Sequence, residues 1–122
     1  MPTMELLVTR VNLTYTLGTM EKYCFDLDGT LCTNTEGEYA SAAPISRRIA
    51  VVNELFDGGH EITIFTARGT ETGIDWRQLT EEQLASWGLK YHRLILGKPF
   101  AHKYVDDRAM SDIDFFAEFL KN

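Results

Sequence analysis

Two aspartates, Asp26 and Asp28, stand two positions apart in the stretch YCFDLDGTLC, directly after an apolar run and directly before a Gly-Thr turn. The pair can simply end a strand in an Asp-rich turn. It can also belong to a metal-assisted phosphoryl-transfer site, where Asp26 attacks phosphorus and Asp28 transfers protons to the leaving oxygen and from water. Both interpretations are open until the rest of the chain is considered.

Apolar runs alternate with helical patterns along the chain. Strands are predicted at residues 22–27, 61–66, 93–97 and 103–107. Helices are predicted after Pro44, over residues 79–88 with Thr80 and Gln83 as a capping box, and from Ser111 onward. This alternation predicts a small doubly wound α/β domain, Rossmann-like, with a mostly parallel sheet and helices on both faces. Residues 20–122 form the expected catalytic core, and residues 1–19 an N-terminal strand or arm.

Polar side chains follow each of the predicted strands. The carboxyl ends of parallel strands meet at one edge of the sheet, where ligands bind. The residues expected there are Asp26, Asp28, Thr66, Arg68, Lys98, Asp106 and Asp107. Crowded carboxylates require a cation, and oxygen ligands favour Mg²⁺. Lys98 would offset the charge of a phosphate, Thr66 would donate a hydroxyl, and Gly29 would let the turn aim backbone N–H groups at the same anion.

The bulk composition excludes several other classes of protein. The chain has 122 residues, 44% hydrophobic and 25% charged, as in one ordinary globular domain. A net charge of −6 argues against nucleic acid or an anionic membrane as the partner. The sequence has no apolar run long enough for a membrane span and no signal-peptide pattern, so a cytoplasmic location is expected. Cys24 and Cys32 are expected to be reduced thiols.

Together these residues resemble the haloacid dehalogenase (HAD) superfamily of aspartate-nucleophile phosphatases. The first motif, FDLDGT at residues 25–30, fully matches the DxDGT pattern of that family. The second is ITIFTAR at 62–68, the third is Lys98 in LGKP, and the fourth is YVDDR at 104–108. The resemblance covers roughly residues 21–120.

The resemblance implies a magnesium-dependent phosphatase with an aspartyl-phosphate intermediate on Asp26 and with Asp28 as general acid and base. The implied metal ligands are Asp26, Asp28 (through its main-chain carbonyl), Asp106 and Asp107. The implied phosphate-binding residues are Gly29, Thr66, Ala67 and Lys98. Residues 31–44 and 67–97 are too short to hold a cap domain, so the chain is similar to the cap-less group. An open site of that kind admits bulky substrates or is closed by a second subunit in a homo-oligomer.

The substrate is expected to be a small phosphorylated metabolite. The segment from Gly69 to Pro99 is similar in style to small phosphatases of bacterial capsule and polysaccharide biosynthesis, which favours a sugar phosphate. Candidate substrate contacts are Arg68, Asn34, Tyr39 and Trp76. Each has an alternative role: a structural salt bridge for Arg68, helix packing for Trp76, and an ordinary surface loop for Asn34 and Tyr39.

Three other functions stay open from the sequence alone. A phosphotransferase would pass the same phosphoryl group to an alcohol instead of water. A signalling receiver domain also combines acids, a Thr and a Lys with Mg²⁺, but its paired acids follow the first strand, whereas here the pair comes last. A catalytically silent binding or assembly module would use residues 1–19 as its working surface. The complete motifs count against it, since sequence drift would be expected to lose at least one of them.

Overall fold

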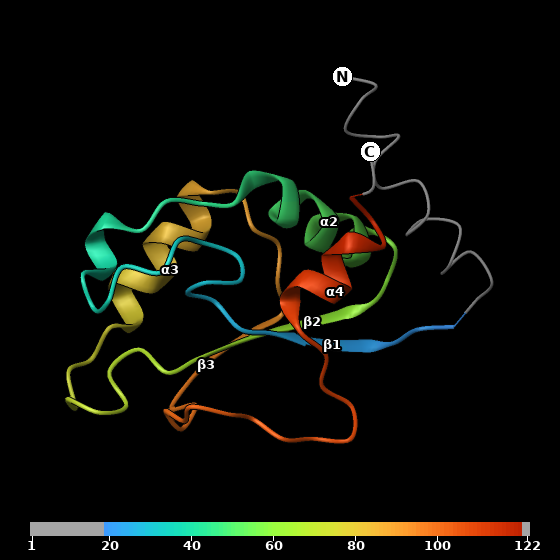
Figure 1. Cartoon of the computed structure of the whole chain (residues 1–122). Coiled ribbons are helices and arrows are strands. Elements are labelled where there is room, and N and C mark those ends of the chain that lie inside the picture. Colours follow the sequence, from blue (N-terminus) through green and yellow to red (C-terminus); the bar gives the residue numbers. More distant parts are fainter. Residues whose placement is uncertain (1–18, 121–122) are drawn as a thin grey trace.

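A computed structural model describes residues 19–120 and shows a small α/β fold (Figure 1). The elements are β1 (Lys22–Phe25), a 3-10 turn η1 (Tyr39–Ser41), α2 (Ser46–Asp57), β2 (Glu61–Thr66), α3 (Arg77–Ser86), β3 (Arg93–Leu96) and α4 (Asp112–Ala117). The predicted N-terminal arm lies outside the described residues, apart from Thr19.

The three strands form one parallel sheet in the order β1-β2-β3. In this register Phe25 lies beside Ile64, and Ile64 lies beside Leu94. Because the strands are parallel, their carboxyl ends meet at the same edge of the sheet. The segments that follow them, starting at residues 26, 67 and 97, are thereby brought together.

The core lies between the sheet and its helices. Ile62 and Ile64 of β2 are fully buried, and α2 buries an apolar stripe against the same core: Ile49, Val51, Val52 and Leu55. Phe116 of α4 packs on Phe25, with ring centroids 6.0 Å apart. Figure 1 shows the three α-helices on the same side of the strands. On the opposite face Cys24 is exposed and Ile95 is 39% exposed, so the two faces are covered unequally.

The α/β class and the parallel sheet flanked by helices are confirmed. The expected placement of helices on both faces is wrong for residues 19–120, because α2, α3 and α4 lie on one side of the sheet (Figure 1). Residues 19–120 contain no separate cap domain. The last helix begins as predicted, since Ser111 Oγ accepts a hydrogen bond from the amide of Asp114 at 3.1 Å. Within the described range, every helix is too short or too polar to cross a lipid bilayer.

The predicted strand at 103–107 is wrong. This segment has no regular structure, and Val105 is 95% exposed. The Tyr104 hydroxyl donates to the carbonyl of Pro99 at 2.6 Å and accepts from the amide of Ala101 at 3.0 Å. The side chain of Tyr104 thus closes a local loop instead of contributing to a strand. Tyr104 and Val105 are the only apolar residues of the segment, which is too few to favour a strand over that contact.

The predicted capping box at Thr80 is also wrong. Helix α3 begins three residues earlier, at Arg77, with Trp76 as its N-cap residue and no side-chain cap. Thr80 and Gln83 therefore lie inside the helix, where both are buried. Positions three apart in a helix share a face, and these two point toward the site described next.

Candidate active site

The ends of β1 and β3 place Asp26 and Lys98 in direct contact. Lys98 Nζ lies 3.2 Å from Asp26 Oδ1, and Thr30 Oγ1 donates to Asp26 Oδ2 at 3.3 Å. The Asp26 side chain is 37% exposed. Lys98 Nζ also lies over the ring of Tyr104, 4.3 Å from its centroid. The predicted nucleophile is therefore open to solvent and next to a positioned cation.

The DGT turn is held by its own amides. The N–H of Gly29 donates to the carbonyl of Cys32 at 2.8 Å, and the amides of Thr30 and Leu31 donate to the carbonyl of Leu27 at 3.0 and 2.8 Å. Gly29 has φ +85°, a left-handed conformation that favours glycine. Gly29 therefore shapes the turn, and its N–H is used within the turn instead of pointing at an anion as expected.

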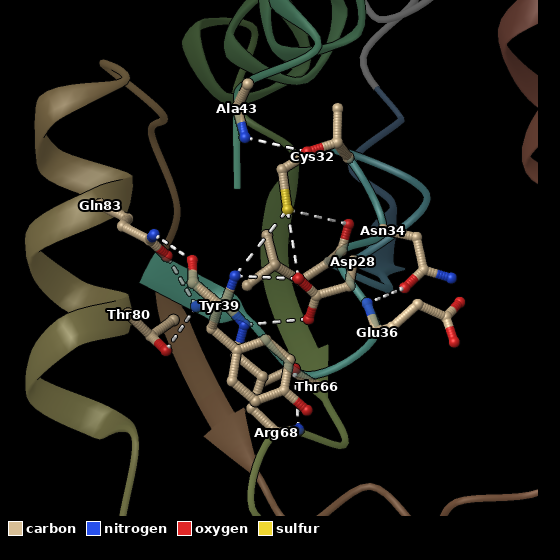
Figure 2. Close-up of polar contacts among 12 residues, drawn as sticks. Asp28, Cys32, Asn34, Glu36, Tyr39, Ala43, Thr66, Arg68, Thr80 and Gln83 are labelled. Atoms are coloured by element: carbon tan, nitrogen blue, oxygen red, sulfur yellow. Dashed lines mark hydrogen bonds and ion pairs between the residues drawn. The ribbon is translucent and has the colours of Figure 1, made fainter. Parts of the chain in front are cut away.

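Asp28 forms a bidentate ion pair with Arg68 (Figure 2). Arg68 Nε donates to Asp28 Oδ2 and Arg68 Nη2 to Asp28 Oδ1, each at 2.9 Å. The Arg68 side chain is completely buried, and that of Asp28 is 18% exposed. A planar guanidinium that meets both oxygens of a carboxylate fixes its orientation as well as its position. Asp28 is thus held in one place beside Asp26.

The remaining donors of Arg68 are also used. Nη1 donates to Thr80 Oγ1 at 3.0 Å and to Gln83 Oε1 at 2.7 Å, and Nη2 lies 3.9 Å from Cys32 Sγ. A guanidinium has five N–H donors, and all five have a partner here. Of the two roles left open for Arg68, the structural salt bridge is the one present. No donor remains for a substrate phosphate, so the predicted substrate contact is corrected.

Tyr39 completes the surroundings of Arg68. Its ring lies 4.7 Å from the guanidinium carbon, and its carbonyl accepts a hydrogen bond from Gln83 Nε2 at 2.7 Å. Burial, followed by the nearby charge of Asp28, raises the pKa of the Tyr39 hydroxyl. Burial and then Asp28 likewise raise the pKa of Cys32 to about 12. The thiol is therefore neutral at physiological pH, and it lies 3.4 Å from Asp28 Oδ1 as a donor.

Thr66 and Ala67 follow β2 at the same edge of the sheet. Thr66 is buried, and its hydroxyl oxygen accepts a hydrogen bond from the amide of Arg68 at 3.1 Å. That contact orients the oxygen and is compatible with the expected donation of the hydroxyl hydrogen to a phosphate. The carbonyl of Thr66 accepts from the Lys98 amide at 3.1 Å, which links the two segments predicted to bind phosphate. Ala67 is half-buried beside them.

Asp106 and Asp107 are not brought to Asp26 and Asp28. Both lie exposed in the irregular segment between β3 and α4. A hydrogen bond from the Arg108 amide (2.8 Å), and then one from Asp107, lower the pKa of Asp106. Because no strand forms at 103–107, nothing delivers these carboxylates to the sheet edge. Across residues 19–120 no three His, Cys, Asp or Glu side chains lie close enough to hold a metal, so this arrangement does not fit the predicted four-ligand Mg²⁺ site.

The other candidate substrate residues differ in position. Asn34 is exposed, and its side chain accepts a hydrogen bond from the amide of Glu36 at 3.2 Å, as in a surface turn. Tyr39 and Trp76 meet edge to face, with ring centroids 5.1 Å apart, and both line a cavity beside the site. Tyr39 and Trp76 therefore remain candidates for contacting a substrate.

Sequence reasoning missed the residues that hold the site together. Thr80 and Gln83 were interpreted as a helix cap, although their i,i+3 spacing also places both on one helix face. Arg48 of α2 was not singled out: its Nη1 donates to the carbonyl of Thr30 at 3.0 Å and to Asp112 of α4 at 2.7 Å. Nothing in the local sequence distinguishes Arg48 from an exposed helix arginine.

The fold and the site define a parallel α/β protein with an aspartate–lysine pair at the carboxyl edge of its sheet. A crystal structure of a structural-genomics target from Vibrio cholerae is 30% identical, with a TM-score of 0.73, over 80% of this chain and 89% of that one. The chain belongs to the same family as this Vibrio cholerae protein.

A more distant similarity is to one chain of the Pnkp1/Rnl/Hen1 complex. It is 19% identical, with a TM-score of 0.51, over 84% of this chain but only 35% of that one. At this identity the likeness extends to the fold alone. No protein-family model and no curated protein sequence matches the chain.

Proposed function

We propose that the protein is a phosphatase of the HAD type, which hydrolyses a phosphomonoester through an aspartyl-phosphate on Asp26. The observation that carries the proposal is the contact between Lys98 and Asp26 at 3.2 Å, next to an Asp28 held by Arg68. A carboxylate nucleophile and a phosphate dianion repel each other, and a cation between them offsets that repulsion. A second carboxylate in a fixed orientation then supplies the proton transfers.

In the first step, a carboxylate oxygen of Asp26 attacks phosphorus and the ester P–O bond breaks. Asp28 enters the cycle as the carboxylic acid and gives its proton to the leaving oxygen, and the phosphoryl group is left on Asp26. In the second step, water attacks phosphorus, Asp28 takes its proton, and the bond between Asp26 and phosphorus breaks to release phosphate. Asp28 is protonated again at the end of the cycle, and Asp26 is a free carboxylate.

The contacts of Asp28 support a different role for each of its two oxygens. Oδ1 accepts from Arg68 Nη2 and from the Cys32 thiol, whereas one donor, Arg68 Nε, contacts Oδ2. Each carboxylate oxygen has two lone-pair sites. Both sites of Oδ1 are used, whereas Oδ2 accepts one hydrogen bond. In this proposal Oδ2 therefore exchanges the proton while Arg68 stays bound to the carboxylate.

Mg²⁺ remains part of the proposal on chemical grounds, since a hard cation favours carboxylate ligands next to a phosphate. The ligand residues would be Asp26 and the segment that carries Asp106 and Asp107, which would have to move to Asp26. When bound, the metal would offset phosphate charge alongside Lys98. The proposal also includes a cytoplasmic location, a sugar phosphate as substrate, and a second copy of the chain over the open site.

The test is phosphate release from acetyl phosphate and from sugar phosphates, with wild type compared with Asp26→Asn and Asp57→Asn. Asp57 pairs with Lys90 on the surface, away from the site, and matches the chemical change. We expect Asp26→Asn to lower turnover at least about 10³-fold and Asp57→Asn to leave it unchanged. Substantial hydrolysis by Asp26→Asn would overturn the mechanism. EDTA should abolish activity and Mg²⁺ restore it; activity that survives chelation would remove the metal from the proposal.

A further inference from the structure

A cavity of about 320 Å³ is lined by Ala67, which follows Thr66, and by Phe100, two residues after Lys98. This volume is near the lower end of the range for small-molecule sites, roughly 300–1,000 Å³. Its lining comes from three segments: the loop leading into η1, the loop after β2, and the segment after β3. Those are the loops that carry the residues after Asp28, after Thr66 and after Lys98. The cavity therefore lies next to the segments that carry Thr66 and Lys98.

Three of the nine residues that line the cavity are aromatic. Tyr39, Trp76 and Phe100 line it, one from each of the three segments. Tyr39 also stacks on Arg68, which holds Asp28. A ligand that fills the cavity would therefore contact the ring of Tyr39, which lies against the arginine that holds Asp28. Aromatic faces pack against flat or apolar faces of ligands and leave the ligand's edges free to form hydrogen bonds.

The cavity carries one kind of charge. Glu71 is the only acidic residue among the described residues that line the cavity, and none of these residues is basic. Thr72 adds a hydroxyl beside it. A carboxylate accepts hydrogen bonds from hydroxyl groups and repels another carboxylate. The chemistry of the lining therefore favours an uncharged ligand with hydroxyl groups.

The loop that carries Glu71 is held in place by close contacts. Gly69 has φ +83°, and a Cβ at that position would lie 2.1 Å from the carbonyl oxygen of Ile74. The amide of Gly73 donates to the carbonyl of Gly69 at 2.8 Å, and Thr70 Oγ1 donates to the carbonyl of Lys98 at 2.9 Å. These contacts fix the loop against the phosphate-binding segment, so the cavity has a defined position relative to Asp26.

We infer that this cavity binds an uncharged sugar ring as the leaving group of the proposed phosphatase and discriminates against sugar acids through Glu71. The inference rests on the proposed function and narrows its sugar phosphate to one with an uncharged ring. The apolar face of the ring would lie against Trp76 and Phe100, and ring hydroxyls would donate to Glu71. A carboxylate on the ring would face Glu71 without a compensating cation.

The test compares glucose 1-phosphate with glucuronic acid 1-phosphate, which differ only at C6, where a carboxylate replaces the hydroxymethyl group. We expect wild type to have a higher kcat/KM for glucose 1-phosphate than for glucuronic acid 1-phosphate. Glu71→Gln should reduce the ratio of these two values about three- to tenfold. Phe100→Ala should lower kcat/KM for glucose 1-phosphate about two- to tenfold. Glu82→Gln in α3 and Ile113→Ala in α4, both exposed and outside the cavity lining, should change neither value.

Acetyl phosphate separates the two levels of the argument, because its leaving group is too small to fill the cavity. Turnover of acetyl phosphate that depends on Asp26, with a sugar preference unaffected by Glu71→Gln and Phe100→Ala, would overturn the inference and leave the phosphatase standing. Faster hydrolysis of a nucleoside monophosphate than of glucose 1-phosphate would also overturn it, in favour of a nucleobase. Absence of acetyl phosphate turnover would refute the phosphatase itself.

Discussion

Replacement of Arg68 by methionine should destabilise the whole domain. The substitution keeps much of the side-chain length but removes every donor, at a position whose side chain is fully buried. Asp28 would lose both of its Arg68 hydrogen bonds, and Thr80 and Gln83 would each lose one. Three polar groups in or near the core would then lack the partner that compensates for their loss of water.

The magnitude follows from the burial of this network. Removing one member of a buried ion pair costs about 3–5 kcal/mol in the free energy of unfolding. The 18% exposure of Asp28 allows water to relieve part of that cost, so we expect about 3 kcal/mol. Against a total stability of about 5–15 kcal/mol, this is a large fraction. The melting temperature should fall by about 10 °C or more.

Urea denaturation followed by circular dichroism provides the measurement, with Arg93→Met as the matched control. Arg93 forms one ion pair with Glu61 at 2.9 Å and is 61% exposed, so its replacement should cost at most about 1 kcal/mol. Arg68→Met combined with Asp28→Asn in a double-mutant cycle should show a coupling of at least about 1 kcal/mol. Equal costs for Arg68→Met and Arg93→Met would refute the assignment of Arg68 as the residue that holds the site.

Two further stability predictions follow from the same region. Folding raises the pKa of the Cys32 thiol from 9.0 to about 12. Between these values the thiol stays protonated in the folded state but ionises in the unfolded state. Its contribution to stability is therefore fully present below about pH 9 and falls as the pH rises toward 12. Urea midpoints should therefore drop between about pH 8 and pH 10.5, and less so in Cys32→Ala; equal drops would contradict this. Gly69→Ala should cost at least about 1 kcal/mol more than Gly73→Ala, because both have positive φ but an added Cβ clashes only at Gly69. Similar urea midpoints for the two variants would show that the loop yields.

Arg68 connects the stability of α3 to the geometry of the site. Its guanidinium contacts Asp28 after β1 and also Thr80 and Gln83 of α3. A parallel sheet brings strand ends together but does not by itself orient the side chains that follow them. Here the helix supplies that orientation, because two of its buried polar groups hold the arginine that holds the aspartate.

The local pattern of residues was sufficient to predict most of the regular structure. Strand β2 was predicted with its observed bounds, because a short β-branched run between polar turns has few other ways to bury its side chains. Helix α2 follows Pro44 and ends at Asp57, directly before Gly58, as expected, since proline and glycine act on the backbone of their immediate neighbours. The strand at 103–107 failed because its conformation depends on Tyr104 contacting Pro99 and Ala101, which a strand pattern does not encode.

The sequence by itself determined that acids, a threonine and a lysine would follow strands of one parallel sheet, because strand periodicity and chain direction are local properties. Only the tertiary structure decided which of them meet: Lys98 reaches Asp26 across 72 positions of the chain, and Arg68 reaches Asp28 across 40. It also decided that Arg68 is structural rather than free for a substrate, and that Thr80 and Gln83 serve the site. Such contacts depend on side-chain packing between distant segments, and spacing along the chain does not specify that packing.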